Sequence, residues 1–418
     1  AGGVVNINAT AADTGRVTIS AAAAFYQINL SHGELDVTGA TLTTNEKIHL
    51  KGGTLLWGGE LNDSKLSYEG GAVRLTTLPS GDLTLSGKQK AELDYVLNNS
   101  NTGNITIASG TGLAILSQTA DGNGYYTGSI TVQEGGTLVL SGDTSNATRV
   151  LAVGAEGSIV NNGLVIVDNS NTSSGTKWVN SMSGKGSVKV ECGKVRLGMT
   201  KADFTGSVEV SHGGSATIAG VAKNFDTLAV LDGNMEIITG GQLTAKELHV
   251  AADGTLNATA NSAEATLTVS GLVNAANGSH LNADLVLADG AVLNVSGSGA
   301  AGSGLIMGSS ITLSDKVVLG SDVVHGLANG ATSYVLASSM DGFIANGNTW
   351  TDGDTGSAAD YFTLASADTG LISLSDYTLG YTGTDGNGVL TLALTAPEPA
   401  TATLSLLALA ALAARRRR

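Results

Sequence analysis

The sequence contains one cysteine, Cys192, only three prolines in 418 residues, and few aromatic or charged side chains. A single cysteine cannot form an internal disulfide, a cysteine-based zinc site or a CxxC redox motif. We expect Cys192 to be a small strand residue, because free cysteine packs like a hydrophobic side chain. A disordered chain of this length would carry more proline and charge. With 42% hydrophobic residues, the chain instead has the material for a long, narrow core.

Positive charge is also scarce. The formal net charge is −15, and four of the 21 basic residues are the arginines at 415–418. The residues before Pro397 therefore include 17 basic and 35 acidic side chains, a net charge of −18. A surface with this charge repels phosphate backbones, so we do not expect nucleic acid as a partner.

A short unit repeats along the chain, consisting of a glycine-containing turn followed by a strand with alternating apolar and polar residues. This alternation is typical of half-buried strands, and glycine permits the positive φ of tight turns. Where the units are clearest, they recur roughly every 18 to 25 residues, a spacing that indicates stacked repeats. Examples are residues 32–37, 52–57, 70–75, 135–140, 213–218, 253–258 and 289–295.

These repeats predict an all-β protein built as a parallel β-helix, or β-solenoid. One turn of such a chain cannot bury its apolar side alone, whereas stacked turns share one continuous core. A narrow interior also suits the abundant small aliphatic residues and the 4% aromatic content. An array of β-sandwiches is the alternative, but the strands lack the regular spacing and the hydrophobic bulk of that fold.

The composition changes in the last quarter of the body. Seven of the aromatic residues lie between positions 311 and 394. Because an open last turn exposes unpaired strand edges, a solenoid needs a cap. We therefore expect residues 1–310 to form the repeat body and residues 311–394 to form a C-terminal β cap. Helical patterning is nearly absent before residue 397: residues 21–24 and the segment around Ala260 could form brief turns, but neither keeps a period near 3.6.

Residues 397–418 form a distinct tail. Pro397, Glu398 and Pro399 precede an uncharged segment rich in Ala and Leu, residues 400–414. As a helix, this segment would be about 22 Å long, which is short for a bilayer crossing unless flanking arginines snorkel. The chain ends in Arg415, Arg416, Arg417 and Arg418, charges that stay on the cytoplasmic side of a membrane. The body would then lie outside the inner membrane.

The order of motif, short apolar helix and basic end resembles the PEP-CTERM sorting signal of Gram-negative bacteria. This resemblance implies recognition by an exosortase, a membrane-embedded cysteine protease, with Pro397, Glu398 and Pro399 as its substrate motif. It further implies an exported protein of the cell envelope that is attached to the surface or secreted. The repeats of the body also resemble autotransporter passenger regions as a class, although here the sorting tail occupies the C-terminal end.

Candidate catalytic and metal-binding residues are scattered. A polysaccharide-acting enzyme on this scaffold would need clustered carboxylates, but the candidate acids stand in turn-like sequences, which favours structural roles. These acids are Asp121, Asp352, Asp354, Asp360 and Asp385. Segment 383–388 is similar to a single calcium-binding repeat without tandem copies. The six histidines lack HxH or HExxH spacing, and His32 and His212 each precede a turn glycine. We predict no catalytic, cofactor or metal site.

Three tryptophans, Trp57, Trp178 and Trp350, have two interpretations. Packing or capping is the default, whereas an outward tryptophan would stack on a sugar. The leading functional hypothesis is a structural or adhesive surface or matrix protein. Its expected partners are exosortase and the inner membrane, transiently, and exopolysaccharide or host and surface glycans. A polysaccharide lyase or hydrolase on the same scaffold is the alternative.

Overall fold

The structure is a computed structural model of the whole chain, and part of the chain is described in it. It describes residues 3–8, 15–38, 42–44, 46–57, 66–75, 82–86, 90–93, 103–115, 128–141, 158–168, 176–179, 181–199, 204–220, 224–239, 242–260, 263–298, 302–383 and 386–395. The tail predicted at 397–418, with its sorting motif, apolar helix and arginines, lies outside these residues.

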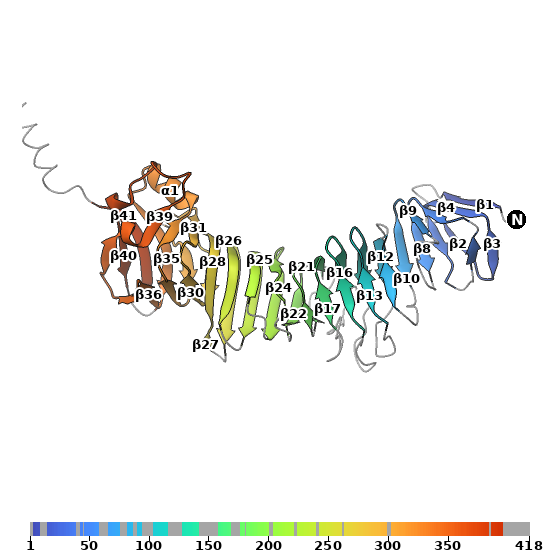
Figure 1. Cartoon of the computed structure of the whole chain (residues 1–418), viewed down its shortest axis with the longest axis horizontal. Coiled ribbons are helices and arrows are strands. Elements are labelled where there is room, and N and C mark those ends of the chain that lie inside the picture. Colours follow the sequence, from blue (N-terminus) through green and yellow to red (C-terminus); the bar gives the residue numbers. More distant parts are fainter. Residues whose placement is uncertain are drawn as a thin grey trace, which may run out of the picture.

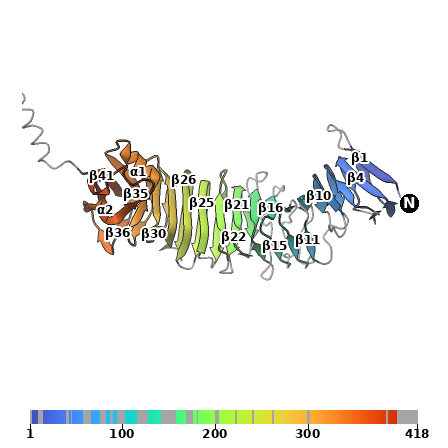
Figure 2. The ribbon, with the colours of Figure 1, turned by 45° about the horizontal axis from the view of Figure 1, so that its top comes forward.

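The chain winds into a β-solenoid whose parallel strands stack along one long axis (Figure 1). Consecutive strands of one turn belong to different ladders. For example, β21 (Ser187–Cys192) and β22 (Lys194–Met199) are followed by Phe204, which forms a bridge with Gly184 of the turn before. Figure 2 shows the same stack from a second direction, with β10 to β26 side by side. The prediction of a parallel β-helix is confirmed.

The strands of the N-terminal half form several parallel ladders. The longest runs through β2 (Arg16–Thr18), β5 (Glu34–Asp36), β8 (Thr54–Trp57), β10 (Ala72–Leu75), β12 (Lys90–Leu93), β14 (Gly112–Ile115), β16 (Thr137–Ser141), β18 (Leu164–Asp168), β21 and β23 (Ser207–Val210). Two others are β1 (Val4–Asn8), β4 (Gln27–His32), β7 (Ile48–Leu50) and β9 (Leu66–Tyr68), and the pair β3 (Ala23–Phe25) and β6 (Leu42–Thr44). The remaining two are β11 (Leu83–Leu85), β13 (Ile105–Ile107), β15 (Ile130–Val132), β17 (Ile159–Asn161) and β20 (Met182–Ser183), and β19 (Thr176–Val179), β22 and β24 (Ser215–Gly220).

Three longer strands, β25 (Asn224–Thr239), β26 (Leu243–Ala260) and β28 (Thr266–Ala276), each pair with more than one strand on the same side. The short β27 (Ala263–Glu264) pairs antiparallel with the end of β26. Parallel stacking continues through β29 (His280–Asn282), β30 (Asp284–Leu287), β31 (Val292–Ser296), β32 (Leu305–Met307), β33 (Ser310–Leu313) and β34 (Val317–Leu319).

Register places the apolar residues of successive turns directly above one another. Leu55 pairs with Leu35 and with Val73, and all three side chains are fully buried. Alternation along each strand then directs every second residue inward, so that the turns share one hydrophobic cluster. Burying one such side chain contributes about 1.5–3 kcal/mol.

The glycine turns of the first repeats also stack. Gly33, Gly53 and Gly71 have φ of +83°, +72° and +81°, the left-handed region that favours glycine. The amide of Thr54 donates to the carbonyl oxygen of Gly33 at 2.9 Å, and the amide of Ala72 donates to that of Gly53 at 2.9 Å. The predicted role of these glycines as positive-φ turn residues is confirmed.

The C-terminal region contains antiparallel pairs and helices as well as parallel strands. The antiparallel pairs join β35 (Ser333–Met340) to β41 (Gly388–Leu394), β36 (Gly342–Ala345) to β37 (Asn348–Trp350), β38 (Thr355–Ser357) to β40 (Tyr377–Thr382), and β40 to β41. The elements α2 (Ala358–Tyr361), β39 (Phe362–Leu364) and the 3₁₀ turn η1 (Leu374–Asp376) complete it.

The sequence pattern did not indicate the helix that the C-terminal region contains. The helix α1 (Ser321–Ala328) buries Val323, Val324 and Leu327. An eight-residue helix spans little more than two turns, so its periodicity is too short to stand out in the sequence. Packing against the solenoid stabilises it: the Asn294 side chain on β31 accepts a hydrogen bond from the Asp322 amide at 3.0 Å, in the first turn of α1.

Candidate functional site

Two of the candidate acids lie in a turn and accept hydrogen bonds from backbone amides. Asp354 accepts hydrogen bonds from the amide and the hydroxyl of Thr351, at 2.6 and 2.9 Å, and these bonds lower the pKa of its carboxyl group. Asp352 accepts one from the Gly383 amide at 2.7 Å. The predicted turn roles of these two residues are confirmed. Asp360 lies exposed in α2, while Asp121 and Asp385 lie outside the described residues.

Two of the histidines each approach one glutamate. His49 approaches Glu69 at 3.7 Å, and His249 approaches Glu247 at 3.3 Å. His212 has a φ of +51° in its predicted turn. In the described part of the chain, no three His, Cys, Asp or Glu side chains are grouped so as to hold a metal ion.

A serine, an aspartate and a histidine meet beside α1, although no sequence pattern connects them. Buried Asp368 accepts a hydrogen bond from the Ser321 hydroxyl at 2.8 Å, and its other oxygen lies 3.8 Å from Nε2 of His325. A catalytic triad requires the histidine to contact the serine, whereas here the aspartate does. The arrangement ties α1 to the turn at Asp368.

The structure distinguishes the roles of the tryptophans. Trp57 belongs to the hydrophobic core, and Trp350 packs edge-on against Phe343 and Tyr361 with ring centroids 5.1 and 5.2 Å apart. Packing is therefore confirmed for these two. The backbone of Trp178 pairs with that of Arg196 in the β19–β22 ladder. Cys192 is a half-buried residue at the end of β21, as predicted.

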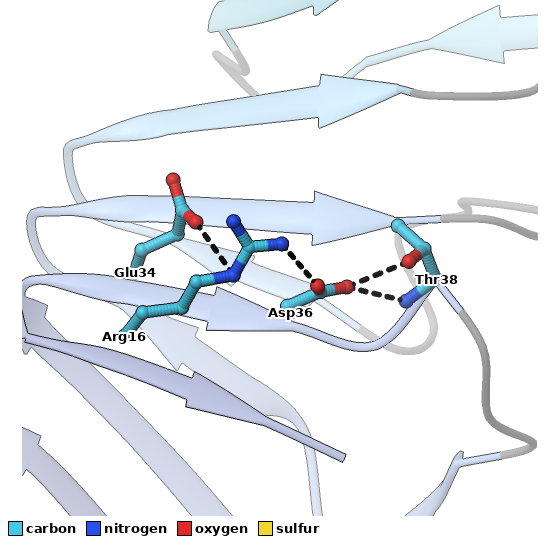
Figure 3. Close-up of polar contacts among 4 residues, drawn as sticks. All are labelled: Arg16, Glu34, Asp36 and Thr38. Atoms are coloured by element: carbon cyan, nitrogen blue, oxygen red, sulfur yellow. Dashed lines mark hydrogen bonds and ion pairs between the residues drawn. The ribbon is translucent and has the colours of Figure 1, made fainter. Parts of the chain in front are cut away.

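A charged cluster joins the first two turns of the long ladder (Figure 3). Arg16 on β2 donates from Nε to Glu34 at 3.2 Å and from its guanidinium to Asp36, both on β5. Asp36 also accepts hydrogen bonds from the hydroxyl and the amide of Thr38, at 2.7 and 3.0 Å. The bond from Arg16, followed by those from Thr38, lowers the Asp36 pKa to about 2. Although the cluster was not predicted, Arg16 and Glu34 are one repeat apart, which is the signal that could have found it.

An extended polar arrangement lies on the ladder formed by β22, β24 and the C-terminal parts of β25 and β26, followed by β29. Register aligns two outward columns over these five strands. The first column is Lys194, Ser215, Asn234, Thr255 and His280, and the second is Arg196, Thr217, Glu236, Asn257 and Asn282. We call these ten residues the polar strip.

Each position of the polar strip is polar, whereas the residues between the two columns are core residues. Val195, Ala216, Met235, Leu256 and Leu281 are at most 1% exposed. Hydrogen bonds link neighbours within the second column: Thr217 donates to Glu236 at 3.3 Å, and Asn282 donates to Asn257. The strip is therefore a row of donors and acceptors held at the spacing of the turns.

Small or apolar side chains border the polar strip on one side. In register beside the second column stand Gly198, Ala219, Ile238 and Thr259, and Ile238 is 39% exposed.

Within the described residues, no helix is both long and apolar enough to span a membrane. No protein-family model, curated protein or solved structure matches this chain.

Proposed function

We propose that this protein is an exported surface or matrix protein whose β-solenoid acts as a structural or adhesive rod. Its C-terminal tail is the address that an exosortase reads. The observation that carries the proposal is the unbroken stacking of parallel turns along one axis, from β2 to the C-terminal region (Figure 1). Such a stack is stiff because each turn is held to both neighbours by ladder hydrogen bonds and a shared core.

The C-terminal region acts in this proposal as the cap of the rod. The strands β35 and β36 would otherwise end the parallel ladders. They are covered by antiparallel pairing with β41 and β37, respectively. The packed rings of Phe343, Trp350 and Tyr361 supply a bulky closure for a narrow core. Covering strand edges in this way prevents uncontrolled pairing with other chains.

The alternative of a polysaccharide lyase or hydrolase has less support. Asp354 accepts hydrogen bonds from Thr351 in its own turn, Asp352 accepts one from the Gly383 amide after β40, and Asp36 is paired with Arg16. Acid–base catalysis needs carboxylates that face a substrate together. We therefore favour the structural or adhesive role.

The proposal is tested by deleting residues 397–418 in the native bacterium and measuring display by surface antibody labelling of intact cells. The deletion should abolish surface display and leave the protein in the periplasmic fraction, because it removes the apolar segment 400–414 together with the motif. A matched control replaces Arg415 to Arg418 with lysines, which keeps the orienting charges and should keep display. Unchanged display of the truncated protein would show that the tail is not the address.

A further inference from the structure

The polar strip differs chemically from the surface that protein partners use. Protein interfaces are centred on aromatic and apolar side chains, whereas all ten positions of the strip are polar. The strip contains Asn, Ser and Thr side chains, which offer hydrogen-bond donors and acceptors without charge. The apolar border beside it, with Ala219 and Ile238, offers contacts of the opposite kind.

The geometry of the strip is linear and periodic. Neighbouring turns are about 4.8 Å apart, and the two columns are separated by two residues, or about 6.8 Å. Five turns therefore make a strip about 19 Å long that runs along the solenoid axis. A ligand that fits this strip must itself be linear, must repeat, and must carry hydroxyl groups beside C–H surfaces. A polysaccharide chain has these properties.

Charge selects between neutral and acidic polysaccharides. The strip contains Lys194, Arg196, Glu236 and His280, a net charge of +1 with the histidine neutral, whereas the whole chain carries −15. An acidic polymer is repelled by that overall field, while a neutral polymer is not. The hydrogen bonds within the second column hold Thr217, Asn257 and Asn282 in place before any ligand binds and so reduce the entropy cost of binding.

We propose that the polar strip binds a neutral polysaccharide chain laid along the solenoid axis. This inference rests on the proposed function, because it names the partner of the adhesive or matrix rod. Trp178 stands next to Arg196 in register, at the start of the second column.

The test is affinity electrophoresis of the full-length protein in native gels. The gels contain a neutral polymer (hydroxyethyl cellulose, galactomannan or dextran) or an acidic one (alginate). At least one neutral polymer should retard the protein, to the same extent at low and high salt, and alginate should not. Retardation by no neutral polymer, or stronger retardation by alginate, overturns the proposal.

Matched variants locate the binding. The strip variant Asn234→Ala/Asn257→Ala should bind about tenfold more weakly, because two hydrogen-bonding side chains are lost. The control Asn29→Ala/Asn274→Ala removes two asparagines elsewhere on the solenoid and should bind as the parent does. If the strip variant melts early by circular dichroism, Ser215→Ala/Thr217→Val replaces it as a more conservative change. Equal binding by strip and control variants overturns the proposal.

The two proposals fail in different ways. The strip variants keep the tail, so they should still reach the cell surface, whereas the tail deletion should not alter binding in the gel. Binding in the gel therefore tests only the polysaccharide proposal, and surface display tests only the sorting proposal.

Discussion

Replacing Gly53 with alanine should destabilise the first turns more than the same replacement at Gly290, although both residues have a φ of +72°. Alanine in this region costs about 1 kcal/mol at either position. The surroundings differ, however. A Cβ atom on Gly53 would lie 2.4 Å from the carbonyl oxygen of Gly33, whereas one on Gly290 would meet no atom within 4 Å.

The contact at Gly53 has no easy relief. The Gly33 oxygen is held by the Thr54 amide at 2.9 Å, so moving it breaks a ladder hydrogen bond. Overpacking that forces a backbone shift costs about 1–3 kcal/mol. We therefore expect Gly53→Ala to lower the local free energy of unfolding by about 2–4 kcal/mol, and Gly290→Ala to lower it by about 1 kcal/mol.

Hydrogen–deuterium exchange measured by mass spectrometry is the suitable assay, because a stack of repeats opens in parts rather than in one transition. Peptides covering β7 and β8 should exchange faster in Gly53→Ala, and peptides covering β30 and β31 should change less in Gly290→Ala. Equal losses of protection in the two variants would refute the reasoning, because backbone conformation alone would then explain both.

Two further predictions concern the charged cluster and the core. The Asp36 carboxyl titrates at about 2 in the folded chain and at about 3.9 when unfolded, so its ionised form stabilises the fold above about pH 4 and that stabilisation is lost as the pH falls to about 2. Because Arg16 is 55% exposed and solvent screens the pair, we expect a loss of about 1 kcal/mol; exchange of peptides from β5 should show this pH dependence, and Asp36→Asn should remove it. Leu138→Ala, at a fully buried position, should lower the free energy of unfolding by about 2–5 kcal/mol. Val139→Ala, on the outward side of β16, should lower it by less than about 1 kcal/mol. Unfolding in urea, monitored by hydrogen exchange, measures both losses, and equal losses would contradict the prediction.

The local pattern of the sequence was sufficient to determine the solenoid itself. Alternation in segments such as 137–141 specifies which residues face inward, and glycines such as Gly53 and Gly71 specify the turns. Both signals lie within a few residues, which is why they can be recognised without a structure. The short α1 was missed because its stability comes from packing of Val323, Val324 and Leu327 rather than from its own periodicity.

The surface of the solenoid was decided by tertiary structure. The distance between paired residues varies widely: Arg16 pairs with Glu34, 18 positions later, but Ser310 pairs with Gly342, 32 positions later. Because insertions in the turns change this distance, the sequence does not show which outward residues stand in one column. Inward residues are selected by alternation alone, whereas the polar strip depends on the register of five strands, which the packing of the shared core determines.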